Sequence, residues 1–180
     1  MPDRDLVALW EAHCRCEFET RDADATMTTM VASPYVNHVP TMTGGVGYDE
    51  LRRFYRYHFI GNNPPDFRMT PVSRTVGESS VVDEFVLRFT HTTEIDWMLP
   101  KIPPTGRPVE IAMVAIVQFE DDKLAHEHIY WDQASVLAQI GVLDPKMLPV
   151  AGAAAARKVL DRTMPSNELM GIRWKKSATL

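Results

Sequence analysis

The chain has few of the features that would assign it to a specialised class of protein. Its two cysteines, Cys14 and Cys16, lie two apart on a predicted helix, where side chains do not face each other, so neither a disulfide nor a shared metal is expected. No run approaches the roughly 18 apolar residues of a membrane-spanning helix, and the first residues lack the apolar core of a signal peptide. The net charge of −5 argues against nucleic acid and anionic membranes as partners. These features predict a cytoplasmic protein.

Familiar catalytic motifs are missing as well. No Gly-x-Ser-x-Gly sequence occurs, which disfavours a serine hydrolase. The glycine-rich segment Thr43–Gly47 has no phosphate-loop lysine, and we interpret it as a turn without a nucleotide role. The composition is that of a globular protein, because 180 residues that are 45% hydrophobic and 24% charged can form one full core. We expect one domain over residues 1–143 and an appended helical arm, not a second domain, over residues 144–180.

The spacing of apolar residues changes along the chain from that of helices to that of strands. In chain order, the predicted elements are helices ending near Thr20, at Asp22–Val31 and starting at Asp49, strands at 67–76, 81–92 and 109–119, and helices at 133–140 and 151–160. A proline-rich loop over residues 93–108 is long enough to be functional. Helices followed by an antiparallel meander predict an α+β fold in which helices cover one face of a curved sheet and leave a cavity.

The last predicted hairpin carries an unusual row of polar side chains. Its two strands meet at a two-residue turn, Asp121–Asp122. Directly opposed residues share a face of a sheet, and successive residues alternate faces. Pairing across the turn therefore puts one set of residues on a single face: Ile111, Met113, Ala115 and Val117 with His126, His128, Tyr130 and Asp132. An apolar wall that bears imidazoles, a phenol and a carboxylate predicts the lining of a pocket.

Asp132 is the predicted proton-transfer group of this pocket. A carboxylate in an apolar cavity is poorly solvated, which raises its pKa towards neutrality and lets it take a proton from carbon beside a carbonyl. His128 and Tyr130 would hydrogen-bond a substrate oxygen as negative charge develops. His38, from a facing segment, would orient Asp132 or act as the acid. The residues predicted to bind the substrate are His91, Phe89, Met113, Ala115 and Trp97.

Each of these polar residues also has a structural interpretation. Asp132 precedes a helix, and as an N-cap it would accept backbone N–H bonds, which would lower its pKa and spoil it as a base. His38 and Tyr130 are equally compatible with a structural role, in which their polar atoms form hydrogen bonds with neighbouring groups. His91 fits either the pocket or a sheet edge, and Trp97 fits either a lid over the pocket or a dimer contact.

The paired histidines of the hairpin, His126 and His128, are candidate metal ligands. Two imidazoles two apart on a strand can share one ion. His126 lies near the turn, however, and Asp132 follows six residues later, which is about 20 Å by strand rise and too far for one ion. We therefore predict no metal and no cofactor.

Several motifs together resemble a known family. In chain order they are YVNHVP, GYDELRRFY, RFTHTTE, PPTGRPV, FEDDKL and YWDQASVLAQIG, and over residues 6–143 they resemble the SnoaL-like branch of the nuclear-transport-factor-2-like superfamily. The resemblance implies a cone, in which a strongly bent antiparallel sheet wraps three N-terminal helices around a pocket. Relatives include polyketide cyclases, ketosteroid isomerase, scytalone dehydratase, limonene epoxide hydrolase and members without catalysis.

The resemblance also bears on the site residues. In the cyclases an aspartate at the end of the last strand moves the proton, and Asp132 matches it; a histidine after the second helix lines the pocket, and His38 matches that one. A further histidine of the cyclases falls near Gln118 or Ala115 here, so the same cyclisation is not implied.

Two classes of function follow. The first is a cofactor-independent acid–base enzyme that acts on a small hydrophobic carbonyl or lactone compound by isomerisation, cyclisation, dehydration or hydrolysis. The alternative is a non-catalytic module of the same fold for small-molecule binding or dimerisation. The superfamily uses the outer sheet face for dimers, and a homodimer is expected here because that face is predicted to carry Ala112, Val114, Ile116, Ile129 and Trp131.

Overall fold

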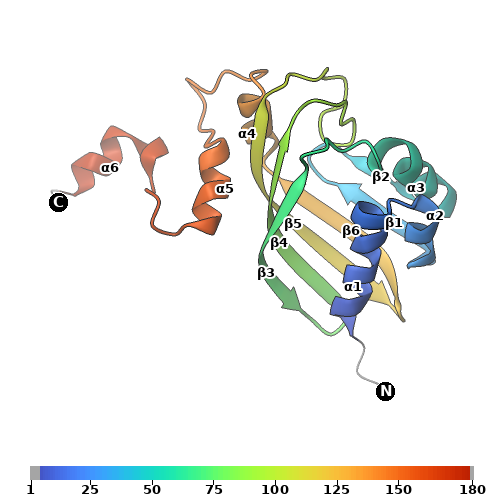
Figure 1. Ribbon diagram of the computed structural model, residues 1–180. Coiled ribbons are helices and arrows are strands. Elements are labelled where there is room, and N and C mark those ends of the chain that lie inside the picture. The colour runs from blue at the N-terminus through green and yellow to red at the C-terminus, as the bar shows by residue number, and fades with distance from the viewer. Residues whose placement is uncertain (1–4, 179–180) are drawn as a thin grey trace.

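A computed structural model describes residues 5–178 (Figure 1). The strands are β1 (Met30–His38), β2 (Thr43–Val46), β3 (Arg68–Val76), β4 (Ser80–Thr90), β5 (Pro108–Glu120) and β6 (Lys123–Trp131). The helices are α1 (Leu6–Arg15), α2 (Ala23–Thr28), α3 (Tyr48–Phe54), α4 (Gln133–Gln139), α5 (Ala153–Leu160) and α6 (Ile172–Ser177), with π-helical turns η1 (Cys16–Thr20) and η2 (Tyr55–Phe59) and a 3-10 turn η3 (Glu168–Met170). The predicted α+β fold, a curled open sheet with helices against it, is confirmed.

The sheet is mixed, not wholly antiparallel. Its strand order is β2-β1-β6-β5-β4-β3, and β1 pairs with β6 in parallel while every other neighbouring pair is antiparallel. The prediction of a purely antiparallel sheet is therefore wrong at one pair. The cause lies in the segment after α2, which was predicted to stay helical to Val31 but turns extended at Met30 and joins the sheet beside β6. The predicted turn at Thr43–Gly47 contains β2.

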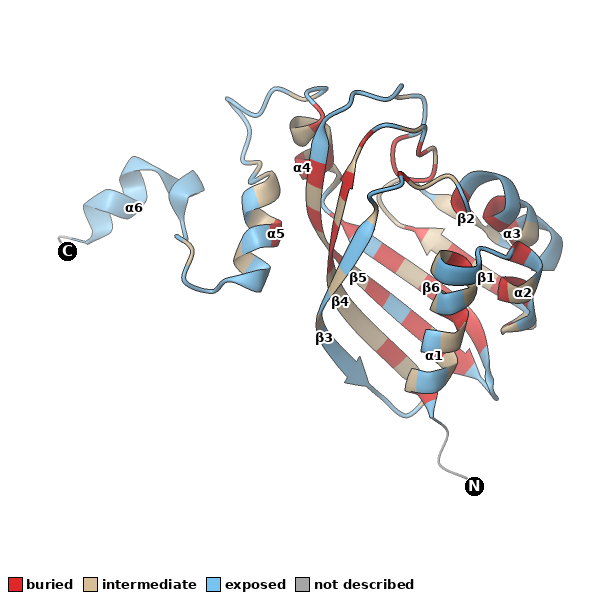
Figure 2. Ribbon diagram, in the orientation of Figure 1, coloured by how far each residue is buried: buried red, intermediate tan, exposed pale blue. Residues whose placement is uncertain are grey.

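The concave face of the sheet holds the hydrophobic core. Residues along β5 alternate between buried and less buried positions, as expected for a strand with one face towards the core. Figure 2 shows buried positions recurring along β4, β5 and β6 and on parts of α2 and α3. Helix α1 begins at its N-cap Asp5, whose carboxylate accepts the N–H of Ala8 at 3.0 Å, and buries Leu6, Trp10 and His13.

The register of the β5–β6 hairpin differs from the predicted one by a single residue. The turn at Asp121–Asp122 and the pairing of Glu120 with Lys123 are as predicted, and Asp121 takes a positive φ of 52°. Between Gln118 and Phe119 the register shifts, because β6 contains one extra residue: Phe119 pairs with Leu124 and Gln118 pairs with His126. A slip of one residue moves every later side chain of the strand to the other face.

The C-terminal segment follows the sheet as an extension. Helix α5 packs on β5, and the guanidinium of Arg157 lies 2.8 Å from the carboxylate of Glu110. The backbone N–H of Gly152 donates to the hydroxyl of Ser135 at 3.0 Å, which ties the start of this segment to α4. Beyond α5 the chain runs away from the sheet through η3 to α6 (Figure 1), and α6 is exposed throughout. No helix within residues 5–178 is long and apolar enough to cross a membrane.

Candidate active site in the cone

A cavity of about 380 Å³ lies between the concave face of the sheet and the helical segment formed by α1, η1 and η2. This volume falls within the range of about 300–1,000 Å³ that is usual for small-molecule sites. Its wall is mainly aromatic and aliphatic, and the side chains that give it this character are Trp10, Phe18, Val36, Phe59, Phe67, Phe85, Leu87, Trp97, Met113, Ala115 and Ile129. The cavity is therefore suited to an apolar ring compound.

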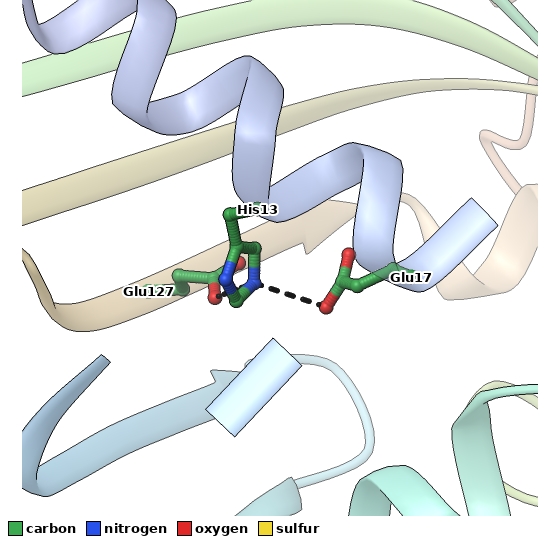
Figure 3. A group of neighbouring side chains, drawn as sticks. All are labelled: His13, Glu17 and Glu127. Atoms are coloured by element: carbon green, nitrogen blue, oxygen red, sulfur yellow. Dashed lines mark hydrogen bonds and ion pairs between the residues drawn. The ribbon is translucent and has the colours of Figure 1, made fainter. Parts of the chain in front are cut away.

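The polar groups of the wall meet at one imidazole. Nε2 of His13 lies 3.2 Å from Oε1 of Glu17 and 3.3 Å from Oε1 of Glu127, and all three side chains are almost fully buried. Figure 3 shows the imidazole of His13 reaching down from its helix between Glu127 on β6 and Glu17 on η1. The hydroxyl of Tyr55 donates to Oε1 of Glu127 at 3.2 Å. Glu17, Tyr55 and Glu127 line the cavity directly, and His13 stands behind them.

The hydrogen bonds of His13 fix where its protons lie. The hydroxyl of Thr29 donates to the carbonyl of Thr26 at 2.6 Å, so its oxygen can only accept from Nδ1 of His13, 2.6 Å away. Nδ1 therefore carries a proton. Nε2 faces two carboxylate oxygens, and the nearby Tyr55 hydroxyl, 3.4 Å away, donates its one proton to Glu127. Without a proton on Nε2, no hydrogen would therefore lie between the imidazole and the two carboxylates. A second proton must thus lie between His13 and the carboxylates of Glu17 and Glu127.

Burial and charge act on the pKa values of this cluster in different directions. Burial disfavours the imidazolium of His13, but the carboxylates of Glu17 and Glu127 outweigh it and raise the pKa of His13 to about 10. Burial raises the pKa of Glu17, and the adjacent His13 opposes that rise. Burial, together with the charges of Glu127 and Glu17, raises the pKa of the Tyr55 hydroxyl well above its ordinary value. The raised pKa of His13 thus keeps a proton in the cluster at neutral pH.

Two π-helical turns bring the polar groups to the cavity. Helix α1 widens into η1 at Cys16, which presents Glu17 and Phe18 to the cavity, and α3 widens into η2 at Tyr55, which presents Tyr55 and Phe59. A π turn holds an extra residue and is frequent at functional sites. The extra residue of η1 is accommodated at its end by Arg21, which adopts the left-handed conformation with φ of 53°. Both turns therefore serve the same cavity from different helices.

His38 forms a separate polar point in an aromatic part of the wall. Its Nδ1 donates to the carbonyl of Thr43 at 3.2 Å, and the rings of Trp97 and Phe59 lie 4.8 and 5.5 Å away between centroids. Burial lowers the pKa of His38 to about 4. The ring is therefore neutral near pH 7, with its proton on Nδ1 and a free lone pair on Nε2.

Charged groups near the N-terminal half of α1 brace one edge of the cavity. Arg74 donates to both carboxylate oxygens of Asp83, at 2.6 and 2.8 Å, and to Glu11 at 2.9 Å. The indole N–H of Trp10 donates to Asp83 at 2.7 Å. The hydrogen bonds that Arg74 donates to the carboxylate of Asp83 are the main reason that the pKa of Arg74 is raised. These contacts tie α1 to β3 and β4 across the cavity.

The structure places the predicted site residues in three groups. His38, Trp97, Met113 and Ala115 line the cavity. Phe89 is buried against Phe67 in the core, outside the cavity wall. His91 is also buried away from the cavity: its Nδ1 lies 3.2 Å from the hydroxyl of Thr105, and its Nε2 has no partner within residues 5–178. Burial lowers the pKa of His91.

His128, Tyr130 and Asp132 do not face the cavity, so their predicted placement is wrong. The bulge after Leu124 turns His128 and Tyr130 to the convex face, where they pair with Ile116 and Val114. Asp132 is exposed and forms the N-cap of α4: its Oδ1 accepts the backbone N–H of Ser135 at 3.2 Å and its Oδ2 accepts the Ser135 hydroxyl at 2.6 Å. The N-cap interpretation of Asp132 is the one that the structure confirms.

The same bulge brings in a residue that sequence reasoning missed. Glu127 stands between His126 and His128 in the sequence and turns into the cavity together with Ile129. Trp131, predicted with Ile129 for the outer face, is likewise buried. Glu17 was missed as well, although a glutamate four residues after a histidine on an apolar helical stripe is a signal that could have identified it.

The three residues His13, Glu17 and Glu127 are also close enough to hold a metal ion, because their ligand atoms all lie within 4.8 Å of one another. The hydrogen bonds described above link the same atoms through a proton. The paired histidines of the hairpin, His126 and His128, lie on the convex face with ring centroids 5.1 Å apart, outside the cavity.

Known proteins share this architecture. A protein of Streptomyces laurentii, TsrD, is 19% identical, with 77% of this chain and 96% of that chain covered at a TM-score of 0.60. A Jannaschia protein provisionally named a SnoaL-like polyketide cyclase is 18% identical, with 80% and 97% covered at 0.58. A Catenulispora acidiphila protein with a ketosteroid isomerase-like fold is 20% identical, with 75% and 93% covered at 0.54. At these identities the likeness shows the fold.

The chain accordingly has the cone fold of nuclear-transport-factor-2-like proteins. It belongs to the SnoaL-like domain family, whose pattern matches residues 10–127 and so includes His13, Glu17, Tyr55 and Glu127. No curated protein matches the chain.

Proposed function

We propose that this protein is an enzyme that moves a proton on a small hydrophobic carbonyl or lactone compound held in the cone, using side chains alone. The reaction is an isomerisation, cyclisation, dehydration or hydrolysis. One observation carries the proposal: two buried carboxylates, Glu17 and Glu127, lie within 3.3 Å of one nitrogen of His13 at the wall of an apolar cavity. Such an arrangement stores a proton where water is scarce, which is what general acid–base catalysis needs.

Within the cluster we assign the proton-accepting role to Glu17. Burial raises the pKa of its carboxyl group, which makes the carboxylate a stronger base near neutral pH. Glu127 accepts hydrogen bonds from Tyr55 and His13 and thereby keeps the imidazolium of His13 in place. Glu17 takes the proton from carbon beside the carbonyl, the electron pair moves to the carbonyl oxygen, and Glu17 returns the proton at another atom. The positive charge of His13 stabilises the intermediate.

The test is deuterium uptake from heavy water by a panel of cyclic ketones and lactones, followed by mass spectrometry, which requires no knowledge of the product. The wild-type protein should accelerate uptake by at least one of them. Glu17→Gln keeps the size of the side chain but removes the base, and should slow uptake by about a hundredfold or more.

Asp132→Asn is the matched control, because asparagine caps a helix as well as aspartate does and Asp132 lies outside the cavity. Its uptake rate should equal that of the wild type. Uptake by Glu17→Gln at the wild-type rate contradicts the assignment of the base. Absence of uptake across the whole panel favours the alternative function, a binding module of the same fold.

We also propose that two copies associate through the convex face of β5 and β6. Ile116 and Tyr130 lie on this face and are 36% and 42% exposed, with Val114 beside Tyr130. Exposed aliphatic and aromatic side chains that adjoin on one sheet face favour association. Ile116→Asp should convert a dimer into a monomer in light scattering, and a wild-type protein that is monomeric at micromolar concentration contradicts the proposal.

A further inference from the structure

Most donors in the cavity wall are already occupied, and the exception, the exposed guanidinium of Arg15, forms an ion pair with Glu19 at 3.9 Å. The hydroxyl of Tyr55 donates to Glu127, and the indole N–H of Trp97 donates to Asn63 at 3.1 Å. Elsewhere in the wall, the indole N–H of Trp10 and the guanidinium of Arg74 both donate to Asp83. A ligand that enters the cavity therefore meets few free N–H or O–H groups.

The acceptors, in contrast, are in surplus. His38 is 4% exposed and lines the cavity, and the hydrogen bond from its Nδ1 to Thr43 is the one that its ring makes with the described residues. Its Nε2 is left as an unpartnered acceptor. His38 lies on the same face of β1 as Val36, which pairs with Glu127 on β6. The free acceptor thus lies on the same stretch of wall as the carboxylates of Glu127 and Glu17.

The charged groups of the cavity also favour a ligand that donates hydrogen bonds, because most of them are negative. In the deep part, two carboxylates, Glu17 and Glu127, face one imidazolium, His13, so one negative charge remains. The carboxylates of the wall and rim outnumber the guanidinium groups by six to two: Glu11, Glu17, Glu19, Asp83, Glu84 and Glu127 against Arg15 and Arg74. The aromatic faces that share the wall, those of Trp97 and Phe59 among them, are attractive to a cation.

We propose that the ligand of this cavity is a hydrophobic ring compound that carries a protonated amine. Its ammonium N–H groups donate to Nε2 of His38 and to the carboxylates at Glu127, and its ring lies against the aromatic wall. The inference extends the proposed function, on which it rests for the identity of the site, by naming the charge of the substrate. An ammonium group near the carbonyl also makes the neighbouring C–H bond more acidic, which suits proton removal by Glu17.

The experiment compares three probes with one ring and different charges: aminoindane, which is protonated near pH 7, indanol and indane carboxylate. Binding is measured by calorimetry with the full chain. Aminoindane should bind about tenfold more tightly than indanol, and the carboxylate should not bind. The preference for aminoindane should fall about tenfold in Glu17→Gln, which removes a buried negative charge, and should also fall in His38→Phe, which keeps a ring but removes the acceptor.

Glu120→Gln, at the exposed end of β5 beside the hairpin turn, is the control for a general effect of net charge and should leave all three affinities unchanged. Circular dichroism shows whether each variant folds. If His38→Phe does not fold, Glu17→Gln alone provides the test. Equal binding of aminoindane and indanol overturns the proposal, as does failure of all three probes to bind or an unchanged preference in Glu17→Gln.

Because this readout is binding, its outcome is separable from that of the catalytic proposal. Selective binding of aminoindane without any deuterium uptake would support the ammonium site and refute the proposed enzymatic activity. Deuterium uptake by uncharged ketones, with no binding preference for aminoindane, would support the enzymatic activity and refute the ammonium site.

Discussion

Raising the pH from about 7 to about 8.5 should lower the free energy of unfolding, because the folded chain holds a proton that the unfolded chain has lost. The pKa of His13 rises from 6.5 to about 10 on folding, since the attraction of Glu17 and Glu127 outweighs the effect of burial. A group whose pKa is raised on folding stabilises the fold fully below its unfolded value. That contribution is then lost as the pH rises through the folded value.

The magnitude follows from the number of protons. Between the two pKa values the folded state binds one more proton than the unfolded state, so stability falls by about 1.4 kcal/mol per pH unit. Over the proposed window the loss is about 2 kcal/mol. The window stops at 8.5 because burial also raises the pKa values of Cys14 and Tyr55, whose ordinary values are 9.0 and 10.0, and these groups add losses of the same sign at higher pH.

Urea denaturation followed by circular dichroism, at constant ionic strength and several pH values, measures this slope. The double variant Glu17→Gln/Glu127→Gln keeps the shape of the cluster but removes both carboxylates. His13 is then neutral in both states above pH 7, because burial alone lowers the pKa of a histidine. Its slope should be close to zero, whereas Asp132→Asn should keep the wild-type slope.

Two results would refute this reasoning. The first is a wild-type stability that does not change between pH 7 and 8.5, which would mean that the cluster holds no extra proton. The second is an equal slope in the double variant, which would place the titrating group elsewhere.

Three further changes test other parts of the structure. Thr29→Val leaves the buried Nδ1–H of His13 without an acceptor and should cost about 1–3 kcal/mol in urea denaturation and slow deuterium uptake; an unchanged rate would show that the imidazole needs no such support. Gly44→Ala would place a Cβ 2.0 Å from the carbonyl oxygen of Val36 and should lower the melting temperature through a loss of about 1–3 kcal/mol, unlike a surface substitution in α6. Ser135→Ala removes the hydroxyl hydrogen bonds to Asp132, the cap of α4, and to Gly152 before α5. It should lower the free energy of unfolding by about 1 kcal/mol and speed proteolysis after residue 144. A cleavage pattern equal to that of the wild type would contradict the link between α4 and the C-terminal segment.

The architecture was predictable because apolar periodicity reports which side of an element is buried. The long strand at 109–119, the turn at Asp121–Asp122 and the helix after Asp132 all lie close to their predicted bounds. The parallel pairing of β1 with β6 was not predictable in the same way, because it joins segments about 90 residues apart. The short strand β2 was hidden in a glycine-rich sequence that is also typical of turns.

The identity of the site could not be obtained from alternation alone. The extra residue in β6 adds no charge, proline or glycine to the sequence, since Leu124 and Ala125 are both buried apolar residues that suit a strand. Without that residue, His128 and Tyr130 would have faced inward as predicted. His13 lies on the buried stripe of α1, but its partner Glu127 comes from a distant strand whose register had first to be known.

The position of that extra residue has a consequence for comparing this chain with its relatives. An alignment of homologous sequences assigns equivalent positions on β6 only if any gap in the hairpin is placed at Leu124–Ala125. A gap placed after Glu127 would instead match Glu127 with a position of the opposite parity, which on a strand belongs to the other face of the sheet. It would then transfer catalytic roles between residues that never occupy the same side of the sheet.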